Sequence, residues 1–131
     1  MKKLSSMILL GLALVFPLGP LHAGPLGDAI KAGMTEAREG VMGLLAAPDA
    51  AAQAEKLKMV ASGTAKVDAA LATADAAKTA ELKTIWTEFK NTRDTGIIPA
   101  IQAGKKDEAK ALAEGIQAER IKKMKAIIDG L

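Results

Sequence analysis

Apolar residues recur at intervals of three and four along four stretches of the chain, which predicts four amphipathic α-helices. The first stretch runs from about Leu26 to Ala46 and the second from about Asp49 to Ala74. On the first, the apolar face consists of Ile30, Met34, Ala37, Val41 and Leu44. On the second, it consists of Leu57, Val60, Thr64, Val67, Leu71 and Ala74. Such alternation is typical of helices that pack at a shallow angle.

The third stretch begins near Lys78 and ends at Gly104, which is a candidate left-handed helix cap, and the fourth runs from about Lys106 to Asp129. The third apolar face consists of Leu82, Ile85, Trp86, Phe89, Arg93, Ile97 and Ala100. The fourth consists of Ala109, Leu112, Ile116, Met124, Ile128 and Leu131. Four helices with short connections bury these faces most simply as an all-α antiparallel four-helix bundle, with up-down-up-down as the default order.

Helix three contains an irregular segment. Pro99 has no amide hydrogen, and its ring would collide with the carbonyl group of Thr95 in a regular α-helix. Gly96 lies next to that carbonyl and weakens the helix further. The sequence therefore predicts a kink near Gly96–Pro99.

The N-terminus has the form of a secretory signal. Lys2 and Lys3 precede ten mostly apolar residues, Met7 to Phe16, and breakers with small residues follow up to Ala23. The apolar run is shorter than the roughly 20 residues that a membrane span needs, which favours cleavage. We therefore expect residues 1–23 to be a cleaved signal peptide and residues 24–131 to be one periplasmic or secreted domain. The chain has no Cys for lipid attachment.

Removal of this segment changes the charge and the available chemistry. Two of the 18 basic residues leave with it, so 16 remain against 15 acidic ones and the mature chain carries +1. This near-neutral balance, together with export, disfavours a nucleic-acid partner. The only histidine, His22, also leaves. Without His, Cys or Tyr the mature chain offers no ligands for haem or for an ordinary zinc site, and no His-dependent catalytic triad, so we expect no metal, no cofactor and no enzyme.

Four side chains are candidate ligand-binding residues. Trp86 sits on the apolar face of helix three, where core packing competes with a role as a ligand platform. Arg93 lies one heptad later on the same face, where a paired or snorkelling arginine competes with an anion-binding one. Arg38 and Arg120 are the only other arginines, and each lies on or beside an apolar face. A guanidinium matches the planar carboxylate of a small anionic ligand.

The segment "WTEFKNTRD", followed by "IIPAIQAGKKDEAKALAEG" and "MKAIIDGL", resembles the third and fourth helices of the four-helix-bundle sensor domain of methyl-accepting chemotaxis receptors. The similarity covers roughly Leu57 to Leu131 and is best between Trp86 and Gly115. It rests on elements that resemble the family's pattern, which are Trp86, Phe89, the Arg93-Asp94 pair, the turn at Ala103 to Gly104, and Glu108-Ala109. Lys105 and Lys106 depart from the acidic residue that often follows the turn glycine.

The resemblance implies a non-catalytic periplasmic module that binds a small anionic or aromatic ligand, or that pairs with a membrane receptor in signal transduction. If the module forms a homodimer as receptor bundles do, ligand could lie between subunits near Arg38. A receptor would continue into a second membrane span, whereas this chain stops at Leu131, so we expect it to act with a partner.

Two alternatives remain from the sequence. The last hairpin is also similar to that of b-type cytochrome bundles, which would make this chain a bundle without haem ligands. Such a bundle could carry copper on Met thioethers, although core packing competes for these residues, which are Met34, Met42, Met59 and Met124. The other alternative is a structural or chaperone-like helical protein whose C-terminal "RIKKMKAIIDGL" pairs with another helix or an anionic surface.

Overall fold

The computed structural model describes residues 24–131, and the predicted signal segment lies outside them. The described chain is helical and contains no strand, which confirms the all-α prediction. Its elements are α2 (Gly24–Ala46), α3 (Ala50–Thr73), α4 (Ala76–Thr92), the π-helix η2 (Arg93–Ile97), α5 (Ile98–Gln102), α6 (Lys106–Glu114) and α7 (Ile116–Asp129). In these residues no helix has the length and apolarity that crossing a membrane requires.

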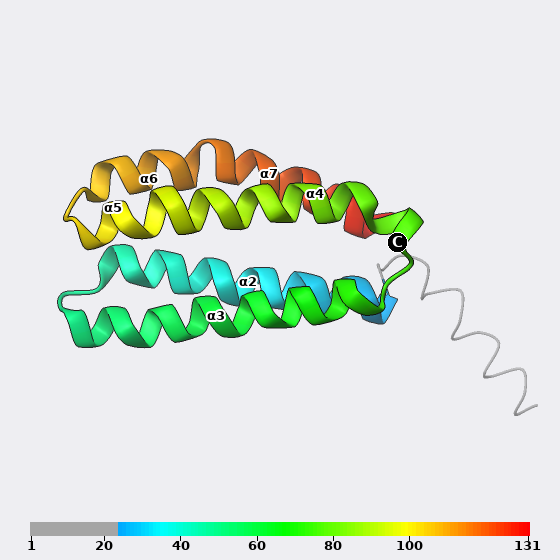
Figure 1. Ribbon diagram of the computed structural model, residues 1–131, viewed down its shortest axis with the longest axis horizontal. Coiled ribbons are helices and arrows are strands. Elements are labelled where there is room, and N and C mark those ends of the chain that lie inside the picture. The colour runs from blue at the N-terminus through cyan, green and yellow to red at the C-terminus, as the bar shows by residue number, and fades with distance from the viewer. Residues whose placement is uncertain (1–23) are drawn as a thin grey trace, which may run out of the picture.

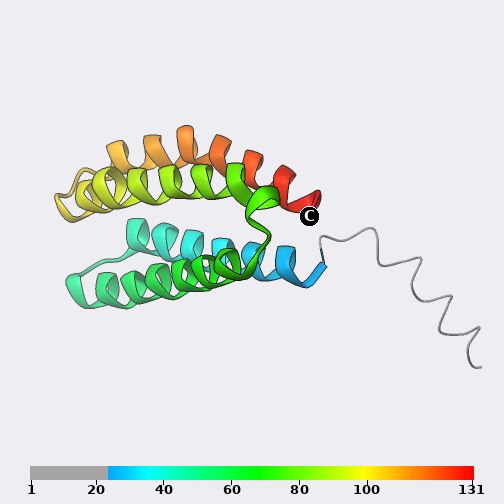
Figure 2. The ribbon, with the colours of Figure 1, turned by 45° about the vertical axis from the view of Figure 1, so that its right-hand side comes forward.

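The elements form two helical hairpins that pack face to face. In Figure 1, α2 lies alongside α3, and the continuous rod of α4, η2 and α5 lies alongside α6 and α7. The turned view separates the two hairpins into two layers, connected through the chain between α3 and α4 (Figure 2). Across the hairpins, α2 contacts α5, α6 and α7, and α3 reaches α4 and η2 through side-chain hydrogen bonds.

The core consists of two apolar clusters, which lie toward opposite ends of the bundle. Trp86 belongs to one cluster, with residues of α2, α3, α4 and α7, and Leu44 belongs to the other, with residues of α2, α3, η2, α5 and α6. All five residues predicted for the apolar face of helix one are buried, and so are all seven predicted for helix three. Helical periodicity alone therefore located most of the core.

Glycines let α2 and α3 approach closely. A Cβ atom added at Gly63 of α3 would lie 2.4 Å from the backbone nitrogen of Ala37 and 2.5 Å from the carbonyl oxygen of Gly33. At Gly40 of α2, an added Cβ would lie 2.9 Å from the backbone nitrogen of Val60. Because these contacts are to backbone atoms, the hairpin tolerates no side chain at this crossing.

Side-chain and backbone caps define the ends of the helices. Asp49 accepts a hydrogen bond from the Ala52 amide at 2.8 Å, and Asp75 accepts one from the Ala77 amide at the same distance, which satisfies free N–H groups at the starts of α3 and α4. After α5, Gly104 has φ +81°, which confirms the predicted left-handed cap. The Lys105 amide donates to the Ala100 carbonyl at 2.7 Å, and the Gly104 amide donates to the Ile101 carbonyl at 3.0 Å, as in a Schellman motif.

Gly104→Ala is expected to lower the free energy of unfolding by about 1–2 kcal/mol, because an L-residue at this positive φ brings Cβ close to the following carbonyl. Chemical denaturation of both proteins measures the change. Gly104→Asn is the matched control, since asparagine visits this region more readily, and it should cost less. Equal stability of the alanine variant and the parent protein would contradict the assigned turn.

A π-helical turn accommodates the proline in helix three. The Ile98 amide donates to the Arg93 carbonyl, five residues back, and α5 starts afresh with Pro99 in its first turn. The π-helical turn interrupts the regular α-helical ladder just before Pro99, where a proline would otherwise remove a hydrogen bond and collide with the carbonyl four residues back. The helix is thus irregular where the sequence predicted a break, while a bend of its axis remains a prediction.

A second irregularity interrupts the last helix at Gly115, which has φ −92° and ψ −103°. Just after it, Ile116 is 48% exposed whereas Gln117 is 3% exposed. The prediction that Ile116 belongs to the apolar face was therefore wrong. The buried face instead follows Ala109, Gln117, Met124 and Ile128.

Candidate functional site

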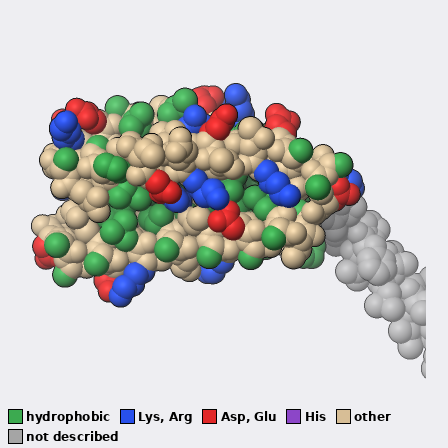
Figure 3. All heavy atoms as spheres, viewed as in Figure 1, with side chains coloured by type: hydrophobic (Ala, Val, Ile, Leu, Met, Phe, Trp, Pro, Cys, Tyr) green, Lys and Arg blue, Asp and Glu red, His purple; other side chains and the backbone are tan. Residues whose placement is uncertain are grey.

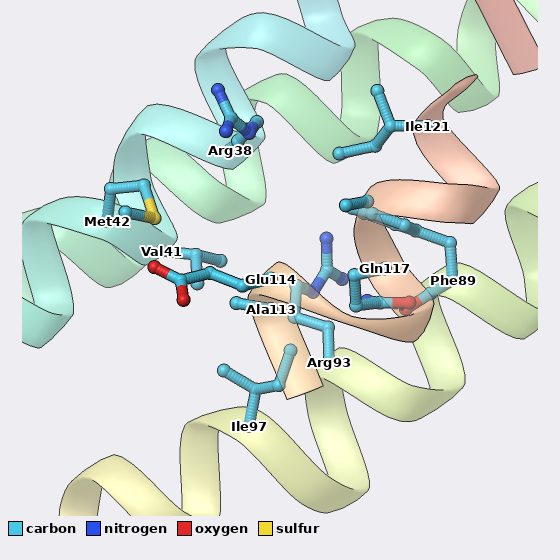
Figure 4. A pocket seen from close by; sticks show the side chains of 11 residues that line it. Arg38, Val41, Met42, Phe89, Arg93, Ile97, Ala113, Glu114, Gln117 and Ile121 are labelled. Carbon is cyan, nitrogen blue, oxygen red and sulfur yellow. Dashed lines mark hydrogen bonds between the residues drawn. The ribbon is translucent and has the colours of Figure 1, made fainter. Parts of the chain in front are cut away.

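A cavity of about 220 Å³ lies between α2 and the second hairpin. Its walls are mostly apolar but carry charged and polar groups from α2, η2, α6 and α7 (Figure 4). The residues that line it are Arg38, Val41, Met42, Phe89, Arg93, Ile97, Ala113, Glu114, Gln117, Ala118 and Ile121. Enclosed apolar walls with a few polar groups are typical of small-molecule sites.

A smaller cavity of about 90 Å³ shares three of these residues, Arg38, Phe89 and Ile121. It extends the lining along α2 and α7 to Glu39 and Lys125. On the face of the molecule where α3 and α4 lie in front, charged side chains of both signs and apolar side chains lie along the boundary between the hairpins (Figure 3). The two cavities share residues of α2 and α7, and their combined lining carries both positive and negative side chains.

Arg93 places a buried guanidinium on the wall of the larger cavity. The residue is 4% exposed; its Nε donates to Asp94 Oδ1 at 2.7 Å, and its Nη2 donates to Asp94 Oδ2 at 3.2 Å. Its Nη1 donates to Thr64 Oγ1 of α3 at 2.7 Å. These contacts support the interpretation of Arg93 as a paired arginine, with Asp94 as its carboxylate partner. Within the described chain these bonds leave one N–H on each Nη without an acceptor, because a guanidinium carries five N–H donors.

Arg38 reaches the same cavity from the opposite hairpin, and its residue is exposed. Within residues 24–131 its guanidinium has neither an ion pair nor a hydrogen bond. Figure 4 shows Arg38 on the α2 side and Arg93 on the side of the second hairpin, with Glu114 and Gln117 also at the cavity. The structure thus brings two of the three predicted arginines to one site.

Arg120 lies beside the cavity and is held by other groups. Its Nη1 donates to Thr92 Oγ1 at 2.6 Å and to Gln117 Oε1 at 3.0 Å. Its Nε lies 3.8 Å from Glu88 Oε2. Arg120 therefore contacts the cavity only through Gln117, which lines it. A direct contact between Arg120 and a ligand remains a prediction.

Trp86 lies in the core and does not line the cavity. It is 2% exposed, and its Nε1 donates to Asp68 Oδ1 at 2.7 Å. Its ring stacks on Phe89 with centroids 5.4 Å apart, and Lys90 Nζ lies 5.7 Å from its centroid. The packing interpretation of Trp86 is thus supported, and the aromatic wall of the cavity comes from Phe89 instead.

Sequence reasoning did not single out Gln117 or Glu114 as cavity residues. Counting back from Ile128 and Met124 in steps of three and four reaches Ile121 and then Gln117, so the periodicity did contain a signal. The neighbouring Ile116 obscured it, because apolar residues are assigned to the core before polar ones. Glu114 lies three residues before Gln117, so the same counting reaches it, but an exposed acidic residue is not assigned to a core face from sequence.

The structure also places the remaining acidic and methionine side chains of interest. Glu36, outside the lining, accepts hydrogen bonds from Lys66 and Ser62, and these lower its pKa. Residues 24–131 contain no group of three or more His, Cys, Asp or Glu side chains suited to a metal ion. Met34 and Met124 pack in the core, as the competing interpretation of the methionines predicted, while Met42 lines the cavity.

Comparison of this chain with protein-family models, with curated proteins and with solved structures finds no match in any of the three. The resemblance to chemotaxis-receptor sensor domains therefore stays a prediction that rests on the sequence pattern.

Proposed function

We propose that this protein is a non-catalytic binding module whose cavity takes a small monocarboxylate with a compact apolar body. The observation that carries the proposal is the cavity between the hairpins, with the guanidinium groups of Arg38 and Arg93 on opposing walls. A carboxylate would accept hydrogen bonds from the N–H groups that Asp94 and Thr64 leave on Arg93. The apolar body would pack on Phe89 and Ile97, whose burial supplies affinity.

The charged side chains around the cavity favour a ligand that carries a single negative charge. Arg93 already has Asp94 as its carboxylate partner, and Glu114 adds a second negative side chain at the lining. Arg38 is the lining cation that has no partner within residues 24–131. A second anionic group on the ligand would therefore meet Glu114 instead of another free arginine, which disfavours dicarboxylates.

The cellular setting belongs to the same proposal. A cleaved signal at residues 1–23 would place the module in the periplasm, where it would act with a membrane receptor or as a homodimer in signal transduction. The resemblance to receptor sensor domains, the all-α fold and the cavity support this assignment. In the bundle we propose, the four helices run up-down-up-down, as the short connections favour, and helix three bends near Gly96–Pro99.

Benzoate is the test ligand, because it joins one carboxylate to a flat apolar ring. Sodium benzoate should raise the melting temperature of the purified protein, and the stabilisation should grow with the logarithm of the benzoate concentration above the dissociation constant. Benzamide has the same ring without the charge and is the matched control, and succinate tests the exclusion of dicarboxylates. No stabilisation by benzoate or by aliphatic monocarboxylates would contradict the ligand class, and stoichiometric copper in the purified protein would support a metal carrier instead.

Arg93→Gln is expected to weaken benzoate binding roughly tenfold to a hundredfold, because it removes charge-assisted hydrogen bonds worth about 1.5–3 kcal/mol. Calorimetric titration of each variant measures the dissociation constant. The exposed Arg38→Gln should weaken binding as well and is less prone to a folding defect. Lys105→Gln also removes one positive charge, but at the turn after α5 and outside the cavity lining, so it is the matched control and should leave the dissociation constant unchanged.

A further inference from the structure

Side-chain donors hold the backbone that leads into η2. Gln117 Nε2 donates to the Phe89 carbonyl at 2.9 Å, and Thr95 Oγ1 donates to the Asn91 carbonyl at 2.7 Å. A π-helical turn shifts the hydrogen-bond register by one residue, so carbonyl groups next to it lose part of their regular pairing. The Phe89 carbonyl also accepts from the Arg93 amide, so Gln117 adds a second donor to the carbonyl that pairs with the first residue of η2.

Gln117 is fixed at both ends of its amide. While Nε2 donates to the Phe89 carbonyl, Oε1 accepts from Arg120 Nη1 at 3.0 Å. Gln117 lies on the inward face of α7, where it is buried and lines the cavity. The last helix thus presents the donor to the helix that contains the π-helical turn.

The position of Arg93 depends on that turn. Arg93 is the first residue of η2, and its carbonyl accepts the bond from the Ile98 amide that defines the turn. If the extra residue moved along the helix, side chains at the turn would rotate by about 100°, the angle per residue of an α-helix. Such a rotation would take the Arg93 guanidinium away from Thr64 and from the cavity wall.

We propose that Gln117 is a positioning residue of the cavity, which holds η2 in the register that places Arg93 on the cavity wall. This inference rests on the proposed function, which makes the cavity a binding site. The effect of Gln117 on the position of Arg93 is nevertheless present in the protein without ligand. The side-chain amide of Gln117, on α7, therefore sets the position of Arg93 on the neighbouring η2.

Amide and arginine side-chain hydrogen exchange, measured by NMR on the purified protein, tests the proposal. Gln117→Glu keeps an acceptor for Arg120 but, when ionised, has no donor for the Phe89 carbonyl. Exchange of the Ile98 amide and of the Arg93 Nε–H should rise by about tenfold or more, while amides around Val67 in α3 stay unchanged. Gln102→Glu, at an exposed position on α5, is the control for the added charge.

Gln117→Leu removes the hydrogen-bond donor without adding a charge. If Gln117→Glu does not fold, the leucine variant alone tests the positioning role. It should give the same local rise in exchange at Ile98 and Arg93. Unchanged exchange at both groups in a folded variant would overturn the positioning role. A rise of equal size in every helix would also overturn it, because it would report general stability. Since no ligand is present, this result is independent of the benzoate titration.

Discussion

Trp86→Ala is expected to lower the free energy of unfolding by about 3–5 kcal/mol, the range observed when a large buried aromatic side chain is truncated. Trp86 is 2% exposed and belongs to a cluster that includes residues of α2, α3, α4 and α7. Its removal leaves a void that these four helices share. Because helices held through many contacts relax only in part, most of the void should persist.

The free energy of unfolding lost in Trp86→Ala includes a contribution from hydrogen bonding as well as one from apolar packing. The Nε1–Asp68 hydrogen bond joins α4 to α3, and Lys90 donates to the same carboxylate oxygen at 3.0 Å. These contacts tie together the two hairpins near their connection. Trp86→Phe keeps an aromatic ring but lacks the N–H donor, so it should cost less, about 1–3 kcal/mol.

Urea denaturation followed by circular dichroism measures both changes without relying on the single tryptophan as a probe. Asp68→Asn tests the hydrogen bond separately, because it weakens the acceptor of the Trp86 Nε1–H group while the indole ring stays in the core. A loss below about 1 kcal/mol for Trp86→Ala would contradict core packing and would favour an exposed aromatic platform.

Gly63→Ala is expected to lower the free energy of unfolding by about 1–3 kcal/mol, although alanine favours helices by about 1 kcal/mol over glycine. The added Cβ would lie 2.4 Å from the Ala37 backbone nitrogen and 2.5 Å from the Gly33 carbonyl oxygen. Backbone atoms of a helix cannot rotate away as side chains can. The hairpin of α2 and α3 would have to separate, with loss of packing along the whole pair.

Gly96→Ala is the matched control, because an added Cβ there meets only Leu112 Cδ1, at 3.1 Å. The end of a flexible side chain can move, so this change should cost less than the one at Gly63. Thermal unfolding of both variants compares them. Equal stability of Gly63→Ala and the parent protein would show that α2 and α3 do not approach this closely.

Much of the fold follows from local properties of the chain. The intervals between apolar residues located the helices, and the start predicted near Asp49 agrees with the N-cap found there. Gly104 was predicted as a left-handed cap because few other residues adopt that backbone conformation, and its φ of +81° agrees. Each of these features depends on residues within a few positions along the chain, so the sequence contains the necessary information.

The cavity could be predicted only in part. Arg93 and Arg38 were selected because arginines beside apolar faces are unusual, and both line it. Trp86 was selected as an irregular bulky residue, and it lies in the core instead. Periodicity assigns a residue to a helix face, but whether that face meets a packed neighbour or a cavity depends on the gap between helices.

By itself the sequence determined the four helices, their apolar faces, the place where helix three departs from α-helical geometry and the glycine cap, because backbone conformation and periodicity are local. The tertiary structure alone decided that Gly33, Gly40 and Gly63 bring α2 and α3 together and that Gln117 is buried while Ile116 is exposed. It also decided that Arg38 and Arg93 share a cavity. These outcomes depend on distances between helices, and such distances follow from the packing of side chains that are far apart in the sequence.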